Sequence, residues 1–305
     1  MLGEKRFAVL IDADNVSAKY IKYILDEISS YGVATYKRIY GDWTKPSSVS
    51  WKDVLLENSV TPVQQYGYTV GKNATDSAMI IDAMDILYSG NVEGFSIVSS
   101  DSDFTKLASR LRESGMLVVG MGERKTPKPF IAACNQFKYL DVLAETEKKS
   151  MELEESRNKP GAVIDVEKNG KPESKKDKET ESENGKAIKS IASTESLEAG
   201  KNMTDISVIK AAILKMMNEV DEDGQRMNMG ELGSRLVKRY PDFDVRNYGD
   251  TKLSKFLKKF DFLDIISDGS SMWVRLRADK ENKVIVKAQE GKATTTRRRR
   301  RNKKK

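Results

Sequence analysis

Residues 7–15 read Phe-Ala-Val-Leu-Ile-Asp-Ala-Asp-Asn, and this pattern is the strongest indication of the fold. Five apolar residues run directly into alternating carboxylates. Residues 95–104 repeat the pattern as Phe-Ser-Ile-Val-Ser-Ser-Asp-Ser-Asp-Phe. A short apolar run that ends in polar turn residues predicts a buried strand of a parallel sheet. Ligands of open α/β sheets bind beyond the carboxyl ends of the strands, so we expect both acidic clusters on one edge of one sheet.

Predicted strands and helices alternate along the first 143 residues. The apolar runs predict strands over residues 7–11, 33–40, 62–66, 94–99, 116–121 and 137–140. Between them, helical spacing of apolar residues predicts helices over residues 20–28, 51–56, 73–87, 104–111 and 129–133. This alternation is typical of an α/β domain with a mainly parallel sheet.

The rest of the chain divides by composition. Residues 148–204 are rich in Glu, Lys, Ser and Asn and contain no aromatic residue, so we expect a disordered linker there, although residues 147–157 could form a transient helix. Residues 205–278 contain three helical apolar stripes and then two alternating segments across an Asp-Gly-Ser turn, which predicts a small winged helix-turn-helix domain. The expected domains are therefore residues 1–147, 148–204, 205–278 and a basic tail, 279–305.

The net charge of +7 resides in this tail. Residues 297–305 read Arg-Arg-Arg-Arg-Arg-Asn-Lys-Lys-Lys and carry eight positive charges, so the remainder is close to neutral. Such an arm is typical of nucleic-acid binding without sequence preference, and a nuclear-import signal is an open alternative.

Composition also excludes several kinds of chemistry. The chain has no histidine, which excludes Ser-His-Asp and Cys-His catalysis and the usual zinc sites. A single cysteine, Cys134, excludes an internal disulfide and is interpreted as a small buried hydrophobe. No apolar run approaches the roughly 20 residues that span a bilayer, and the N-terminus lacks a secretory segment. We therefore expect a cytoplasmic protein without a membrane partner.

With histidine and cysteine chemistry excluded, catalysis would depend on carboxylates and a hard divalent metal ion. Asp12 and Asp14 follow the first predicted strand, Asp101 and Asp103 follow the fourth, and Asp76 begins the helix between them. Mg²⁺ prefers such oxygen ligands, and a cation relieves the repulsion among clustered carboxylates. Asp14 or Asp103 alone is also typical of a helix cap.

These residues carry a family resemblance. Residues 9–15, Lys72 with Asp76 and Asp82, and residues 99–104 resemble the NYN domain of the LabA-like group, which is related to PIN nucleases. The resemblance implies a PIN-like (Rossmann-like) α/β/α sandwich and metal-dependent ribonuclease activity with Mg²⁺ or Mn²⁺.

The NYN resemblance also implies roles for individual residues. The catalytic and metal-binding residues would be Asp12, Asp76, Asp101 and Asp103, and the substrate-binding residues Asn15, Lys72 and Ser100. An exposed loop lysine is the alternative for Lys72. Asp82 lies about 120° from Asp76 around the helix, so a structural role and a site role both stay open.

The second domain resembles the LOTUS, or OST-HTH, family. The matching segment is residues 241–254, Pro-Asp-Phe-Asp-Val-Arg-Asn-Tyr-Gly-Asp-Thr-Lys-Leu-Ser, with Trp-Val-Arg-Leu at residues 273–276. The family implies binding of RNA or protein. Basic residues beside an aromatic residue suit phosphate contact and base stacking, so the predicted RNA contacts are Arg246, Tyr248, Lys252 and Lys255. A solvated helix face with Tyr248 in the core is the alternative.

The sequence thus predicts a metal-dependent ribonuclease joined to an RNA-binding domain. Protein partners of the second domain and a homo-oligomer are left open. One alternative is a non-catalytic RNA-binding adaptor. Another is a phosphatase of the haloacid dehalogenase type, since residues 12–14 read Asp-Ala-Asp, but Asp76 would have no role in it.

Overall fold

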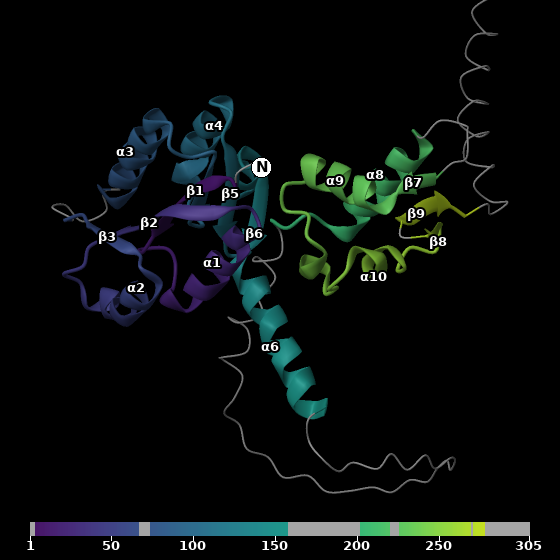
Figure 1. The fold of residues 1–305 in the computed structure, drawn as a ribbon, viewed down its shortest axis with the longest axis horizontal. Coiled ribbons are helices and arrows are strands. Elements are labelled where there is room, and N and C mark those ends of the chain that lie inside the picture. The colour runs from purple at the N-terminus through teal and green to yellow at the C-terminus, as the bar shows by residue number, and fades with distance from the viewer. Residues whose placement is uncertain (1–3, 67–73, 158–201, 220–225, 270, 278–305) are drawn as a thin grey trace, which may run out of the picture. The chain divides into compact units, whose positions relative to one another are not determined.

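The computed structural model describes residues 4–66, 74–157, 202–219, 226–269 and 271–277. The chain forms two compact units, which are coloured by residue number in Figure 1. The N-terminal unit contains residues 1–204 together with 237–249, and the C-terminal unit contains residues 205–236 and 250–305. Most of the predicted linker and all of the predicted basic tail lie outside the described residues.

A six-stranded sheet forms the centre of the N-terminal unit. Its strands lie side by side in the order β3-β2-β1-β4-β5-β6, and all five pairings are parallel. The strands are β1 (Arg6–Asp12), β2 (Val33–Gly41), β3 (Thr61–Gln64), β4 (Gly94–Val98), β5 (Leu117–Gly122) and β6 (Gln136–Tyr139). The strand order reverses beside β1, where open α/β sheets bind their ligands. The prediction of a mainly parallel, PIN-like α/β sheet is confirmed.

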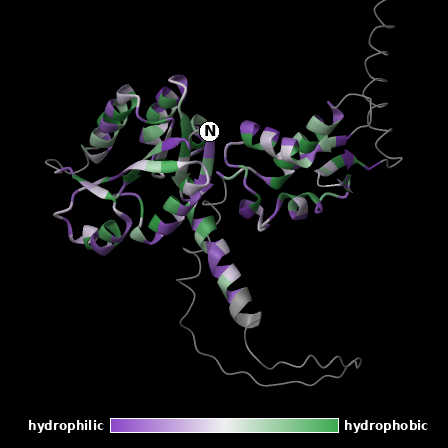
Figure 2. Cartoon of the chain, viewed as in Figure 1, coloured by the Kyte–Doolittle hydropathy of each residue, from purple (hydrophilic) through white to green (hydrophobic). Residues whose placement is uncertain are grey.

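Helices pack against both faces of this sheet. One apolar core contains residues of α3 (Ala74–Ser89), α4 (Thr105–Glu113) and α5 (Lys128–Ala133). The other contains residues of α1 (Ile21–Ser29), α2 (Lys52–Asn58) and α6 (Leu140–Arg157). Alternate residues of β1 enter the two cores: Ala8 and Leu10 the first, Phe7, Val9 and Ile11 the second. The continuous apolar run of β1 is explained by this burial on both faces, and hydrophobic residues gather along the central strands in Figure 2.

Two details differ from the pattern expected along the chain. A 3₁₀ helix, η2 (Pro46–Trp51), precedes α2. Helix α6 continues to Arg157, into the segment predicted as a linker. The burial expected for Cys134 is confirmed: its side chain is 1% exposed, and burial raises the pKa of the thiol to about 12.

The C-terminal unit is small and mixes helices with a sheet. Its elements are α8 (Ile206–Asn218), β7 (Arg226–Asn228), most of α9 (Met229–Arg239), α10 (Leu253–Leu257), β8 (Leu263–Asp268) and β9 (Ser271–Leu276). The strands form an antiparallel sheet in the order β7-β9-β8. The predicted helices and hairpin are present, and β7 adds a strand that the sequence did not predict. Within the described part of the chain, no helix is long and apolar enough to cross a membrane.

Candidate metal centre

The two acidic stretches meet at one edge of the sheet. Strand β1 ends at Asp12, and its neighbour β4 ends at Val98, just before residues 99–103. Because the two strands are parallel and paired, both connecting loops emerge at the same end. The loops are joined directly, since the Ser100 backbone N–H donates to Asn15 Oδ1 at 3.0 Å.

Asp12 is the last residue of β1 at this edge, and its side chain is 3% exposed. Ser99 Oγ donates to Asp12 Oδ2 at 2.9 Å, and the Asp14 backbone N–H donates to Oδ1 at 3.1 Å. Burial raises the pKa of Asp12 to about 6, and the nearby charge of Asp76 adds to the shift. A carboxylate has about four lone-pair positions, so these two bonds leave acceptor capacity for a further ligand.

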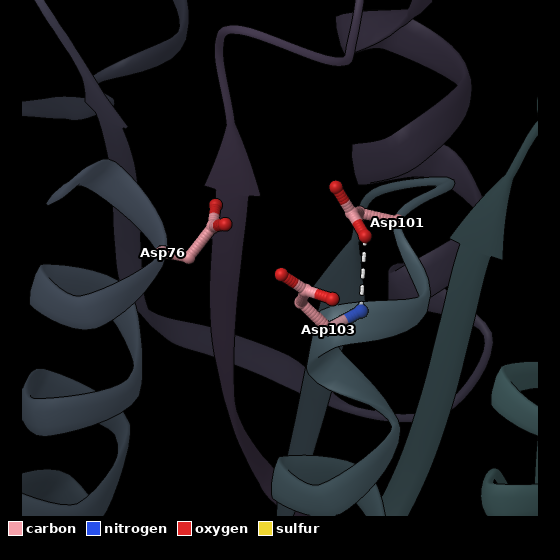
Figure 3. A group of neighbouring side chains, drawn as sticks. All are labelled: Asp76, Asp101 and Asp103. Atoms are coloured by element: carbon pink, nitrogen blue, oxygen red, sulfur yellow. Dashed lines mark hydrogen bonds between the residues drawn. The ribbon is translucent and has the colours of Figure 1, made fainter. Parts of the chain in front are cut away.

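Three other carboxylates converge at the same edge of the sheet. Asp76 lies in the first turn of α3, and Asp101 and Asp103 lie in the loop after β4. Figure 3 shows Asp76 facing the other two from the opposite side of a common space. One oxygen from each of the three residues lies within 4.8 Å of the others. Among the described residues, this is the group of three acidic side chains that could hold a metal ion.

The loop itself fixes Asp101 and Asp103. Asp101 is the N-cap of the 3₁₀ helix η3 (Ser102–Phe104), and its Oδ1 accepts a hydrogen bond of 2.9 Å from the Asp103 backbone N–H. The Asp101 backbone N–H in turn donates to Ser99 Oγ at 3.0 Å. The Ser99 hydroxyl therefore links Asp12 to the loop that carries Asp101.

The cluster fits a hard divalent cation. Burial raises the pKa of Asp76, and the charges of Asp101 and Asp103 raise it further. Ligands of Mg²⁺ lie at about 2.1 Å, so two oxygens on one ion are at most about 4.2 Å apart. Oxygens within 4.8 Å of one another reach such spacing through small side-chain rotations. Asp76, Asp101 and Asp103 could hold the ion, and Asp12 is close enough for the charge of Asp76 to raise its pKa.

Asp14 contacts the start of helix α3 and the loop after β2. Its side chain is 47% exposed, accepts a hydrogen bond of 3.0 Å from Thr75 Oγ1 and lies 3.6 Å from Lys45 Nζ. These contacts join the turn after β1 to the start of α3 and to the loop after β2.

Asp82 also matched the family pattern, and it makes a different set of contacts. It forms an ion pair with Arg38 and accepts a hydrogen bond from Tyr40, both on β2. It does not belong to the carboxylate group around Asp76. Of the two roles left open, its contacts favour the structural one.

Sequence reasoning missed two supporting residues. Ser99 was part of the motif, but spacing cannot reveal which atom a hydroxyl will bind. Gly122 ends β5, where an added Cβ would lie 2.7 Å from Ser99 O and 2.9 Å from Ser100 Oγ. Ser100 Oγ also accepts a hydrogen bond of 2.9 Å from the Glu123 backbone N–H. A glycine directly after a predicted strand, at residue 122, was the available signal for such a close approach.

The remaining predicted substrate contacts lie in different surroundings. Lys72 lies outside the described residues. Lys252 and Lys255 are exposed at the start of α10 in the C-terminal unit. Arg246 and Tyr248 belong to the N-terminal unit, where Arg246 forms ion pairs and Tyr248 donates a hydrogen bond.

Two family models match the chain. The model described as NYN domain matches residues 6–141, and the model described as OST-HTH/LOTUS domain matches residues 204–275. The first match contains the carboxylate cluster. The second begins in the N-terminal unit and crosses both parts of the C-terminal unit.

One curated relative and one solved structure also match part of the chain. The chain is 27% identical to Uncharacterized protein MJ0482 of Methanocaldococcus jannaschii over 124 residues, which are 39% of this chain and 48% of the relative. The chain thus spans about half the length of that curated relative. A crystal structure of a protein of unknown function, VPA0982 from Vibrio parahaemolyticus, matches with a TM-score of 0.40 and 17% identity, over 46% of this chain and 94% of that one.

Proposed function

Because residues 6–141 form an NYN domain and residues 204–275 an OST-HTH/LOTUS domain, in that order, we propose that this protein is a metal-dependent ribonuclease. It would hydrolyse RNA phosphodiester bonds with Mg²⁺ or Mn²⁺. The LabA-like subgroup and a cytoplasmic location stay predictions.

The observation that carries the proposal is the carboxylate group within the NYN domain. Asp76, Asp101 and Asp103 bring one oxygen each within 4.8 Å of the others at the edge where the strand order reverses. Their side chains come from two separate elements. A helix cap would account for Asp101 alone, but it gives no reason for Asp76 to face the same space.

The proposed roles follow from position. Asp76, Asp101 and Asp103 would hold the ion, with buried Asp12 as a further ligand. A bound Mg²⁺ or Mn²⁺ supplies stabilisation of charge on the phosphoryl group and a lowered pKa for the attacking water. Asp103 is the most exposed of the four, so it is also placed to accept a hydrogen bond from water. Since the chain has no histidine, cleavage by paired imidazoles is excluded.

RNA would be bound by several parts of the chain. Near the metal centre, Asn15 and Ser100 are the proposed contacts, with Lys72. In the C-terminal unit, the exposed ammonium groups of Lys252 and Lys255 suit phosphate binding. Two linked binding domains raise the effective concentration of RNA at the catalytic site.

The decisive experiment compares RNA cleavage by the wild type, Asp101→Asn and Asp76→Asn with Mg²⁺, with Mn²⁺ and with EDTA. We expect EDTA to abolish cleavage and each variant to lose about 100-fold or more, because loss of even an outer-shell partner typically costs 10- to 100-fold. Asp85→Asn is the matched control, since Asp85 lies exposed on the same helix as Asp76. Undiminished cleavage in EDTA or in both variants would exclude the metal mechanism.

The same assay separates the alternatives. RNA binding without cleavage in either metal would favour the non-catalytic adaptor. Release of phosphate from small phosphomonoesters without RNA cleavage would favour the dehalogenase-type phosphatase. Such an enzyme leaves Asp76 without a role, whereas Asp76 lies with Asp101 and Asp103.

A further inference from the structure

The outer edge of the parallel sheet contacts a segment that is distant in sequence. β6 is the last strand of the sheet. The backbone N–H of Phe137, in β6, donates to the carbonyl oxygen of Pro241 at 2.8 Å. Residues 237–249 accordingly pack as part of the N-terminal unit. The OST-HTH/LOTUS match includes these residues, so the family boundary and the packing boundary differ.

Four charged groups form a network at this contact. Lys138 Nζ on β6 lies 3.1 Å from Glu27 of α1 and 2.7 Å from Asp244. Arg246 donates two hydrogen bonds of 3.0 Å to the Glu27 carboxylate. It also donates two to Asp244, at 3.0 and 2.7 Å. The two positive and two negative charges therefore balance, and the planar guanidinium binds two carboxylates with paired bonds.

The network is shielded from solvent. The side chains of Glu27, Lys138 and Asp244 are 10–12% exposed, and that of Arg246 is 29% exposed. Burial alone would raise the pKa of both acids, but hydrogen bonds from Arg246 and the charge of Lys138 hold each pKa below its usual range. Removing one member of such a cluster leaves a buried charge without its partner.

Further hydrogen bonds hold the same segment. Asp242 is 3% exposed and accepts hydrogen bonds from the Tyr139 hydroxyl at 3.2 Å and from the Thr204 N–H at 2.8 Å. The Tyr248 hydroxyl donates to the carbonyl oxygen of Thr204 at 2.9 Å. The alternating Asp242, Asp244 and Arg246 thus each contact residues outside their own segment.

We propose that the surface formed by β6, Glu27 and Lys138 is a docking site for residues 241–248 of the same chain, and that docking, rather than RNA binding, is the role of Arg246. Charge complementarity identifies the segment that docks. The site presents Glu27 and Lys138, which pair with Arg246 and Asp244 of the segment. RNA contact then falls to Lys252 and Lys255, which are exposed outside this network. The docking does not depend on RNA cleavage.

The test uses the full chain with a protease recognition sequence inserted within residues 158–201. After cleavage of the folded protein, size-exclusion chromatography reports whether the two fragments stay together. We expect wild-type fragments to co-elute at physiological salt and largely at about 1 M NaCl, because buried pairs are screened much less than exposed ones. Separation of the wild-type fragments at physiological salt would refute the docking.

Charge reversal identifies the contact. Arg246→Glu places a third carboxylate beside Glu27 and Asp244, so these fragments should separate. Lys238→Glu is the matched control, because Lys238 is exposed in the adjoining part of the chain, and its fragments should stay together. If Arg246→Glu fails to fold, Glu27→Gln, which keeps the side-chain shape, should still cause separation at a lower salt concentration than in the wild type. Co-elution of both variants under all conditions would contradict the proposed chemistry.

Two further measurements test whether RNA binds Arg246 and whether a second copy of the chain supplies the docked segment. In uncut protein, Arg246→Ala should change RNA affinity less than twofold, whereas Lys252→Ala with Lys255→Ala should weaken it by tenfold or more. If Arg246→Ala weakens RNA affinity while its fragments still co-elute, then Arg246 contacts RNA. A two-chain mass by light scattering that Arg246→Glu reduces to one chain would mean that a second copy supplies the segment. Either result would overturn docking within one chain.

Discussion

At the scale of single residues, the same side chain takes different roles according to its neighbours. Asp12 is buried and held by the Ser99 hydroxyl, whereas Asp103 is exposed at the cluster of carboxylates. Asp82 forms an ion pair with Arg38 on the sheet. All three aspartates lie in stretches that match the NYN pattern, so the partner atoms, and not the residue type, distinguish a proposed ligand from a structural group.

Ser99→Ala tests whether the Ser99 hydroxyl holds the Asp12 carboxylate in position. Loss of the hydroxyl removes a hydrogen bond to Asp12 Oδ2 and one from the Asp101 N–H. We expect RNA cleavage to fall 10- to 100-fold, as for outer-shell partners of metal ligands, and stability to fall by about 1–3 kcal/mol. Rates at saturating Mg²⁺ and urea unfolding measure the two effects.

Ser96→Ala is the control for this change. Ser96 lies on β4, and among the described residues its buried Oγ has no hydrogen-bond partner. Removing an unsatisfied hydroxyl should leave stability unchanged or slightly increased, and cleavage should stay at the wild-type rate. Equal losses of cleavage in the two variants would mean that Ser99 has no special relation to the site.

At the scale of elements, the site depends on which strands are neighbours. β1 and β4 are more than 80 residues apart in sequence yet pair directly in parallel, which brings Asp12 beside the loop of Asp101 and Asp103. Helix α3 then adds Asp76 from the other side. β5 supports the loop after β4, because the Ser99 N–H donates to the Met121 carbonyl oxygen at 2.9 Å.

Gly122→Ala tests this support from β5. The new Cβ would lie 2.6–2.9 Å from Thr126 Oγ1, Ser99 O and Ser100 Oγ, so the loop that carries Asp101 must move. We expect a loss of about 1–3 kcal/mol in stability, as for overpacking elsewhere, and at least a tenfold loss of cleavage per folded molecule. Cleavage rates corrected for the folded fraction are the measurement.

Gly120→Ala separates the two effects of this substitution. Gly120 lies on the same strand, but its Cβ would meet Cys134 Sγ and Phe137 at 2.6 Å, in the apolar core. It should lower stability comparably while leaving the cleavage rate of the folded molecule near that of the wild type. If Gly120→Ala impairs cleavage as strongly as Gly122→Ala, the effect arises from general strain of the sheet.

At the scale of the whole molecule, charge is distributed unevenly. The eight positive charges of residues 297–305 exceed the net charge of +7, and the carboxylate cluster of Asp76, Asp101 and Asp103 is acidic. An acidic site repels the phosphates of RNA until a cation is bound. Basic groups elsewhere in the chain, including the proposed contacts Lys252 and Lys255, would then supply the attraction to RNA.

Deleting residues 297–305 tests whether basic groups outside the acidic site supply the attraction to RNA. These residues lie outside the described structure, and the prediction comes from their charge. We expect weaker RNA binding at physiological salt and a plot of log K against log [salt] that is shallower by at most about 6, the limit for eight phosphate contacts on a single strand. Cleavage at saturating RNA should be unchanged. An unaltered salt slope would assign the tail another role.

The charged network around Arg246 predicts how stability depends on pH. The pKa values of Glu27 and Asp244 are lowered, because their interactions with Arg246 and Lys138 outweigh the effect of burial. Their contribution to stability is therefore fully present above about pH 5, where these acids are also ionised in the unfolded chain. It is lost as the pH falls below about 4 toward the folded-state pKa values.

Arg246→Ala should reveal this contribution. We expect it to lower the unfolding free energy of the N-terminal unit by about 2–3 kcal/mol at pH 7, less than the roughly 3–5 kcal/mol of fully buried pairs, since Arg246 is 29% exposed. The difference from the wild type should shrink below pH 4. Urea unfolding across this range is the measurement, with Lys238→Ala as control; a difference that is constant with pH would contradict the prediction.

Sequence patterns alone predict the fold class, the order of the domains and the candidate carboxylates. Apolar runs predict strands over residues 7–11 and 94–99, because burial on both faces of a sheet requires continuous hydrophobicity. The absence of histidine restricted the chemistry to oxygen ligands. Placing Asp12, Asp101 and Asp103 at one edge needed only the rule that ligand sites lie beyond the carboxyl ends of parallel strands.

Only the tertiary structure decided which atoms these groups contact. It placed Ser99 between Asp12 and Asp101, Gly122 against their loop, and Arg246 between Glu27 and Asp244. Sequence patterns report the periodicity of burial, which is local along the chain. A hydrogen bond or buried ion pair between residues 219 positions apart, such as Glu27 and Arg246, depends on packing that brings their side chains within about 3 Å. For that reason Arg246 was predicted to bind RNA, while in the folded chain it binds two carboxylates.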